Sequence, residues 1–345
     1  VEFHPEVISR AIAFHKKAQR PSVIGGSMLK LEDPTFLHEA GANLNSTRRI
    51  GTSTDVPAGA IETTGALNYL GRAAEYDYNA WWFCSFPTDA VKEGGLPLPL
   101  FIHGDDIEYG IRLNSHGYKV FCPGGISVWH ESFENKHLTW IRYFDFRNAL
   151  IRLTLHFDNP PKIIIRQLKH VCQRALIRND YGAYIMVVKA FEDFCKGPEI
   201  LSLTNFSEQI KSLDDLYHEY SKVDSSGRYK LSNEELSCQK EKKMKTAMRY
   251  LTANLHSIPV PSIRHFRTTN TRFPWTDVPY FSDITVDLAN GEQIHYRRNL
   301  KKYRSLNKRL RIALKTYKGE LSTVQDAWRS ECPLFCSEDF WKKYP

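Results

Sequence analysis

Residues 98–110 read LPLFIHGDDIEYG, an apolar, strand-like run that ends at Gly104 and is followed by two adjacent carboxylates, Asp105 and Asp106. After the carboxylates, the spacing of apolar residues predicts a helix that ends at Gly117. Similar short apolar runs, separated by Gly, Pro and aromatic clusters, extend over residues 1–155. This pattern of short apolar runs and turn residues predicts an α/β domain.

The Asp105-Asp106 pair has two interpretations from the sequence. In the first, Asp105 caps the helix and Glu108 completes a capping box, which leaves Asp106 unexplained. In the second, the pair has a function, because neighbouring carboxylates repel and raise each other's proton affinity. A fold gains little from such a pair unless a cation, a sugar hydroxyl or a proton in transfer uses the charge.

Two further clusters carry candidate functional residues. His130 stands at the end of a short predicted strand, residues 127–130, and is either a ligand for a divalent metal or a satisfied, partly buried histidine. Trp81 and Trp82 belong to an aromatic run, residues 78–84, which suits either the apolar face of a sugar or the packing of a core.

Composition limits the classes of protein that the chain can belong to. The 345 residues carry a formal charge of +8, which favours anionic partners or reflects a mildly basic surface. No run of eighteen apolar residues occurs, so the sequence predicts no membrane-spanning helix. The seven scattered cysteines favour a reducing compartment, and we expect a cytoplasmic protein that could lie on the inner face of the plasma membrane.

The second half of the chain has a helical texture, and we expect domains at residues 1–155 and 156–345. In the first domain we expect strands at 23–26 and 119–123. In the second we expect helices over 162–195, with a break at 179–182, and further helices over 199–260. A hairpin of 284–287 with 294–296 is expected to turn at Asn290-Gly291.

The segment from Lys301 to Lys318 contains eight Lys or Arg residues and no acidic residue, with apolar residues along one helical stripe. Such a helix can lie on an anionic membrane, or it can pack its stripe on the domain and leave a solvated basic face. Nucleic acid is not expected as a partner, because no known binding motif accompanies the charge.

The order of motifs along residues 1–155 resembles that of family-2 glycosyltransferases, and is most similar to the polymerising galactofuranosyltransferases of cell-wall galactan synthesis. The matching segments are residues 25–29, 37–41, 81–84, 96–101, 105–110, 128–130, 142–144 and 147–148, with a weaker match at 338–344.

This resemblance implies a GT-A fold, an α/β nucleotide-sugar domain with a mostly parallel sheet, followed here by a mainly helical C-terminal region. Such enzymes invert the anomeric centre and use Mn²⁺ or Mg²⁺. By resemblance, Asp106 is the general base, Asp105 binds the acceptor sugar, and His130 is a metal ligand. The same matching has Trp81 and Trp82 line the acceptor site and makes Glu39 a sugar-contacting residue.

The chain also departs from the family pattern. It contains no Asp-x-Asp motif and begins where the family's chain follows that motif. We therefore expect a C-terminal portion of a longer enzyme that lacks the uridine-binding half and, taken alone, turns over little or nothing. Gly104 stands where the galactan polymerases carry an aromatic residue, which reshapes the expected acceptor subsite.

From these residues we expect a transferase that moves a hexosyl unit, galactofuranose from its UDP sugar, to a surface glycan or lipid-linked glycan. The alternatives are a family-2 transferase for another nucleotide sugar, such as that of rhamnose or glucose, and a non-catalytic carbohydrate-binding or scaffold module.

Overall fold

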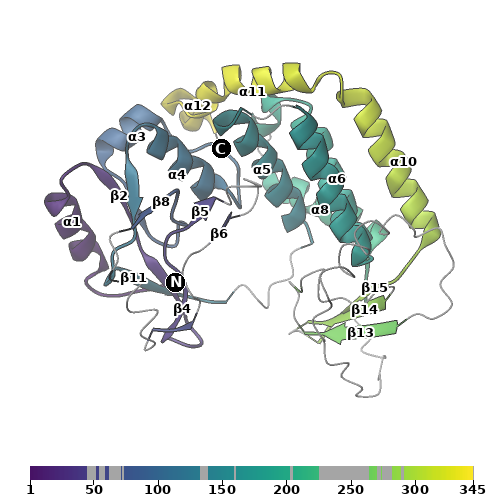
Figure 1. The fold of residues 1–345 in the computed structure, drawn as a ribbon, viewed down its shortest axis with the longest axis horizontal. Helices are drawn as coiled ribbons and strands as arrows, with labels where there is room; N and C mark the ends of the chain where they lie inside the picture. Colours follow the sequence, from purple (N-terminus) through teal and green to yellow (C-terminus); the bar gives the residue numbers. More distant parts are fainter. Residues whose placement is uncertain are drawn as a thin grey trace. The chain divides into compact units, whose positions relative to one another are not determined.

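The computed structural model forms two compact units (Figure 1). The chain passes between them after Ser132, within α5 (Ile141–His156), after Asp158 and within α11 (Leu321–Phe335). Unit 1 consists of Val1–Ser132, Asn148–Asp158 and Trp328–Pro345, and unit 2 of Phe133–Arg147 and Asn159–Ala327. The structure describes residues 1–44, 52–53, 59–61, 71, 74–132, 139–158, 161–202, 205–224, 264–269, 273, 282–288 and 291–344.

Unit 1 is built on short mixed β-sheets. One contains, in spatial order, β1 (Glu2–Phe3), β11 (Ser127–His130), β3 (Ser27–Lys30), β4 (Phe36–Glu39) and β7 (Gly59–Ala60). Another contains β8 (Glu75–Tyr76), β10 (Lys119–Phe121), β2 (Ser22–Gly25) and β9 (Cys84–Ser85), and β5 (Asn43–Leu44) pairs with β6 (Thr52–Ser53). The strands predicted at 23–26, 119–123 and 127–130 are therefore confirmed.

The expectation of a mostly parallel sheet is wrong for the described strands of unit 1. Only β2 with β10 and β3 with β11 run parallel there, and the other pairs are antiparallel. For β3 and β4 the reason is the short connection between them, since a short turn can join only antiparallel neighbours.

Helices cover the central strands of unit 1. They are α1 (Val7–Lys17), α3 (Thr88–Gly94) and α4 (Asp105–Ser115), whereas α12 (Glu338–Lys343) lies near Pro97, whose carbonyl accepts the Trp341 Nε1–H. Side chains alternate along β2, so that Val23 packs with residues of α3 and α4, whereas Ile24 packs with residues of α1. The arrangement is α/β, as the sequence predicts, and it fixes the start of α4 against the sheet.

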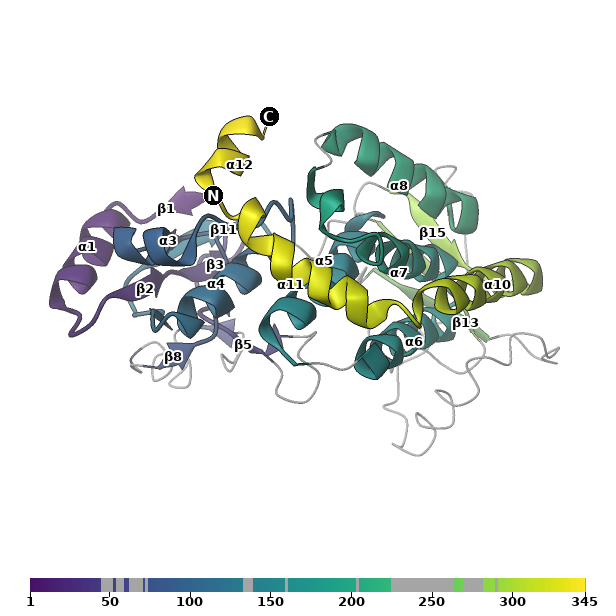
Figure 2. The same ribbon diagram turned by 90° about the horizontal axis from the view of Figure 1, so that it is seen from above.

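Unit 2 combines helices with a four-stranded sheet. Its elements are α6 (Pro161–Ile177), α7 (Tyr181–Phe194), the 3-10 helix η1 (Pro198–Ser202), α8 (Phe206–Tyr220), α10 (Leu300–Tyr317), and the strands β12 (Lys222–Asp224), β15 (Gln293–Tyr296), β14 (Ser282–Asp287) and β13 (Arg264–Thr268) in spatial order. Helix α7 is buried along most of its length, with α6, α8 and α10 packed around it (Figure 2).

Several sequence-based expectations for unit 2 are confirmed. The break between α6 and α7 falls at Asn179, which has a left-handed backbone (φ 55°), and Asp180 caps α7 by accepting the Ala183 N–H at 2.8 Å. The predicted hairpin is β14 with β15, and Gly291 (φ 85°) lies in its turn. Helices expected within 225–263 lie outside the described residues.

The basic segment 301–318 forms α10, and its apolar stripe faces the protein. Leu306 is buried, the Tyr317 ring meets Phe191 of α7 edge-on with centroids 6.3 Å apart, and Arg309 pairs with Glu192 at 2.7 Å. The structure therefore favours the interpretation in which the stripe packs on the domain, with a basic face left toward solvent. None of the described helices combines the length and the apolar character that crossing a bilayer requires.

Candidate active site

The paired carboxylates occupy the first turn of α4. Asp105 and Asp106 are its first two residues, and the N-cap is Gly104, whose carbonyl accepts the Glu108 N–H at 2.9 Å. The predicted capping box is therefore wrong. Gly104, with φ 91°, takes the cap position without a side-chain bond, and Asp105 lies one residue too late to cap the helix.

Glu108 has a structural role instead. Its carboxylate is 1% exposed and pairs with Arg112 at 2.9 Å and with His156 at 2.9 Å. Burial alone would raise the pKa of Glu108, but the Arg112 charge and the His156 hydrogen bond outweigh burial and leave the pKa lowered. This ion-paired cluster joins α4 to the C-terminal part of α5, which positions the start of α4.

Asp106 is the more perturbed member of the carboxylate pair. Burial, followed by the charge of Asp105, raises the pKa of Asp106 to about 6. The Ile107 N–H donates to Asp106 Oδ1 at 2.8 Å and, with the charges of His103 and Arg152, limits that rise. Burial also raises the pKa of Asp105. A carboxylate with a pKa near neutrality can accept a proton and release it again, which suits a general base.

Glu39, at the end of β4, lies close to this pair. Burial, followed by the charge of Asp106, raises the pKa of Glu39 to about 7. The fold thus brings together three carboxyl groups, Glu39, Asp105 and Asp106, that the sequence analysis singled out. Perturbed carboxyl groups gathered in this way are typical of functional sites.

The residues before the pair do not form the expected strand, because the chain leaves the extended conformation at Phe101. Phe101 (φ 72°) and His103 (φ 62°) have left-handed backbones, and Gly104 follows with φ 91°. The side chain of Asn148, on α5, holds this loop: its Nδ2 donates to the carbonyls of Leu100 at 3.3 Å, Ile102 at 2.9 Å and His103 at 2.7 Å. A left-handed backbone at a non-glycine residue costs about 1–3 kcal/mol and persists only where the surrounding structure enforces that conformation.

The two tryptophans lie in different environments. Trp81 is 37% exposed and meets the ring of Tyr109, on α4, edge-on with centroids 5.8 Å apart. Trp82 is half-buried, and its Nε1 donates to the Gly26 carbonyl at 2.8 Å. Asn79 fixes the turn that carries them, since its Nδ2 donates to the carbonyls of Ala80 and Phe83. Trp81 is thus the tryptophan that offers an exposed face beside α4.

His130 stands at the end of β11, as predicted, but not in a metal-binding cluster. Its Nδ1 lies 2.7 Å from the Glu131 carbonyl oxygen. Among the residues that the structure describes, no group of three or more His, Cys, Asp or Glu side chains could hold a metal ion. His130, Asp105 and Asp106 therefore do not form a ligand set by themselves.

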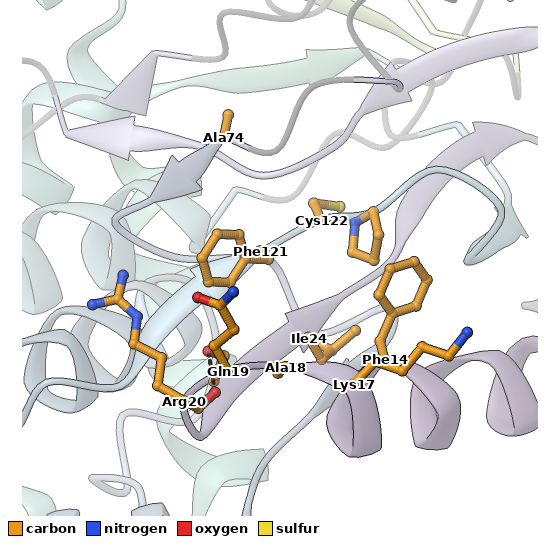
Figure 3. Close-up of a pocket in the computed structure, with 11 residues that line it drawn as sticks. Phe14, Lys17, Ala18, Gln19, Arg20, Ile24, Ala74, Phe121 and Cys122 are labelled. Atoms are coloured by element: carbon orange, nitrogen blue, oxygen red, sulfur yellow. Dashed lines mark hydrogen bonds between the residues drawn. The ribbon is translucent and has the colours of Figure 1, made fainter.

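A separate groove of about 770 Å³ lies elsewhere in unit 1, between the C-terminal end of α1 and one face of β2 and β10 (Figure 3). Its lining includes Phe14, Ile24 and Phe121, with Lys17 and Arg20 among the polar residues. None of the predicted site residues lines it, so the groove is distinct from the carboxylate cluster.

The sequence analysis missed the two asparagines that position the site. Asn148 was part of a matching segment, 147–148, but its bonds to three carbonyls depend on the packing of α5 against the loop. Asn79 lies in the aromatic run, residues 78–84, which the sequence marks by its aromatic residues only. Neither role leaves a local pattern in the sequence, because the amide Nδ2 of each asparagine donates to backbone carbonyls, which every residue has.

No family model matches the chain. Two curated proteins are similar to it. One is the galactofuranosyltransferase GlfT2 of Mycolicibacterium smegmatis, 34% identical over 58% of this chain and 33% of its own length. The other is the galactofuranosyltransferase GlfT2 of Mycobacterium tuberculosis, 28% identical over 97% of this chain and 58% of its own length.

These similarities confirm the resemblance to galactofuranosyltransferases that the motif order indicates. The match with the Mycobacterium tuberculosis protein extends over nearly the whole chain, well past the segments of residues 1–155 that carry most of the motifs. The chain spans from a third to somewhat over half of the length of these curated relatives.

Proposed function

We propose that the chain carries the acceptor side of an inverting glycosyltransferase that moves a galactofuranosyl unit from UDP-galactofuranose to a growing glycan. The GT-A fold is part of this proposal. The similarity to two galactofuranosyltransferases supports the class of reaction. The observation that carries the proposal is Asp106, a largely buried carboxylate in the first turn of α4 with a pKa of about 6.

The proposed step is a single displacement. An acceptor hydroxyl is a poor nucleophile, so Asp106 takes its proton as the oxygen attacks the anomeric carbon. The new C–O bond forms on one face while the bond to the diphosphate oxygen breaks on the other, and UDP leaves with that electron pair. One displacement inverts the configuration, and no covalent intermediate with the protein is needed.

Asp105 and Glu39 are assigned to sugar binding. Asp105 precedes Asp106 in the same helical turn and can accept a hydrogen bond from an acceptor hydroxyl. Burial and the charge of Asp106 raise the pKa of Glu39 to about 7, so near neutral pH this carboxyl group can either donate or accept a hydrogen bond. Trp81 supplies the apolar contact to the sugar ring. Trp82 supports the turn that carries both tryptophans, since its Nε1 donates to the Gly26 carbonyl.

Metal dependence stays a prediction. Mn²⁺ or Mg²⁺ would neutralise charge on the leaving diphosphate, and His130 supplies one candidate ligand. The other ligands would have to come from outside the described residues, so no step above depends on the metal. His130→Ala should weaken the activation of transfer by Mn²⁺, with His116→Ala as the control histidine, and an unchanged Mn²⁺ titration would make His130 purely structural.

The acceptor and its location are also proposals. A lipid-linked glycan acceptor would favour contact with an anionic membrane from the cytoplasmic side. On α10 that contact would use the exposed cations Arg304, Lys308, Arg311 and Lys315, because the apolar stripe packs on the protein. The attraction would be electrostatic and would weaken as the salt concentration rises.

The donor is tested by assaying protein expressed from its complete open reading frame with UDP-galactofuranose, UDP-glucose and a rhamnosyl nucleotide as separate donors. Transfer from UDP-galactofuranose alone is the expected result. Transfer from another donor alone would reassign the sugar within the same class. Oligosaccharide binding without transfer from any donor would instead favour a non-catalytic carbohydrate-binding module.

A further inference from the structure

We propose that Phe101, on the loop that precedes the paired carboxylates and that the amide of Asn148 holds, is a platform for the acceptor sugar. The inference rests on the proposed function and deepens it, since it gives a role to Phe101, a residue for which the sequence predicts none. Its ligand is the apolar C–H face of a sugar ring.

The exposure of Phe101 contrasts with that of its neighbours. Leu98 and Leu100 are 2% and 0% exposed, whereas Phe101 is 39% exposed. A single exposed aromatic residue is ordinary on a protein surface and would carry no inference. What distinguishes Phe101 is its backbone, because a bulky residue rarely adopts a left-handed conformation and does so mainly at functional sites.

The surrounding structure enforces that conformation. The Asn148 amide binds the carbonyl before Phe101, the carbonyl after it, and that of His103. Asn148 is itself 1% exposed, so the loop is held from the interior of unit 1. Phe101 is therefore an exposed aromatic residue on a loop that hydrogen bonds from the interior of unit 1 hold.

The place of Phe101 in the chain, on the loop just before the carboxylates, suits a sugar site. Phe101 lies four residues before Asp105, and a second exposed aromatic, Trp81, leans on Tyr109 of the same helix that carries the carboxylates. Sites for small ligands combine apolar and aromatic surfaces with a few polar groups that fix orientation. Here the rings would bind the sugar's C–H faces and the carboxyl groups its hydroxyls. Phe has no polar atom, so Phe101 contributes to acceptor affinity and not to proton transfer.

The experiment measures KM for a synthetic galactofuranosyl oligosaccharide and for UDP-galactofuranose with wild type, Phe101→Ala, Phe101→Trp and Phe101→Gly. Phe101→Ala should raise the acceptor KM by about tenfold and leave the donor KM and kcat unchanged. Phe101→Trp keeps an aromatic ring at this position and should leave the acceptor KM close to the wild-type value. Phe14→Ala is the matched control, because Phe14 lies in the same unit, is 40% exposed, and lines the separate groove.

Phe101→Gly separates binding from folding. Glycine accepts a left-handed backbone without strain, so this variant should melt at the wild-type temperature or above it, yet bind the acceptor as poorly as Phe101→Ala. An unchanged acceptor KM in Phe101→Ala, or equal impairment of Phe101→Ala and Phe101→Trp, would overturn the proposal.

The same variants distinguish failure of this inference from failure of the proposed function. If wild type transfers no sugar, saturation-transfer NMR with the same oligosaccharide replaces the kinetic assay. Binding that Phe101→Ala weakens and Phe14→Ala does not would retain the platform in a protein that is not a transferase. Binding that is insensitive to Phe101, or no binding at all, would remove the platform.

Discussion

Glu39, at the end of β4, and Asp106, in the first turn of α4, lie close enough that the charge of Asp106 helps to raise the pKa of Glu39 to about 7. The two residues come from separate parts of the sequence, and the packing of α4 on the sheet brings them together. Each carboxyl group is also perturbed by its own burial, so both can change protonation near neutral pH.

The coupling can be measured directly. Asp106→Asn removes a negative charge and should lower the pKa of Glu39 from about 7, while the burial of Glu39 keeps it above the ordinary value of 4.5. A ¹³C NMR titration of the Glu39 carboxyl group would measure the change. Asp89→Asn, at an exposed position of α3, is the control and should leave Glu39 unaffected. An identical Glu39 titration in wild type and Asp106→Asn would show that the charge of Asp106 does not affect the pKa of Glu39.

Stability should depend on pH with a sign set by the raised pKa of Asp106. The folded protein binds the proton of the Asp106 carboxyl group more tightly than the unfolded chain does. The contribution of this proton to the free energy of unfolding is therefore fully present below pH 3.8 and is lost as pH rises through about 6. Asp106→Asn should therefore be close to neutral at pH 4 and stabilising by about 2–3 kcal/mol at pH 8. Urea unfolding of both proteins at the two pH values checks this, and the opposite trend would show that the carboxylate is stabilised by the fold.

The two glycines that bound α4 form a matched pair. Gly104 has φ 91° and Gly117 has φ 90°, so replacement of either by Ala should cost about 1–2 kcal/mol through backbone strain. A Cβ on Gly104 would lie 3.4 Å from Arg152 Nη1, whereas a Cβ on Gly117 meets nothing within 4 Å. Thermal unfolding should show similar losses, and transfer should fall only in Gly104→Ala. Equal transfer by both variants would mean that the turn before Asp105 is irrelevant to activity.

Asn148→Ala should release the loop that contains Phe101 and His103. Three backbone carbonyls each lose one hydrogen bond, although the Leu100 carbonyl keeps that from the Ile102 N–H, and we expect a loss of about 1–3 kcal/mol in the free energy of unfolding. Hydrogen exchange should rise in residues 101–106. Asn114→Ala is the control, because Asn114 bonds to one backbone carbonyl, that of Tyr76, at the far end of α4. Unchanged exchange across the loop in Asn148→Ala would contradict the role given to this amide.

The sequence predicts the parts of the fold that depend on local patterns. The strands around Val23 and Val120, the break at Asn179 and the hairpin turn at Gly291 all carry local signals, and each occurs where expected. The strand-like interpretation of residues 98–103 was wrong because an apolar run resembles a strand, whereas hydrogen bonds from Asn148, distant in the chain, hold this backbone in a loop.

The same limit applies to the site. Adjacent aspartates are visible in the sequence, but the sequence leaves open whether Asp105 caps the helix, and the left-handed Gly104 takes the cap position instead. The proximity of Glu39 to Asp106 follows from tertiary packing, which no local pattern encodes. His130 was placed correctly at a strand end, although the described residues supply no companion ligands.

The most direct test of the account is the rate of galactofuranosyl transfer from UDP-galactofuranose to an oligosaccharide acceptor by wild type and by Asp106→Ala, each expressed from the complete open reading frame. Removal of the general base should lower kcat by about 10²–10⁴-fold, with an unchanged circular dichroism spectrum and no loss of thermal stability. Retention of the wild-type rate by a folded Asp106→Ala protein would contradict the central claim.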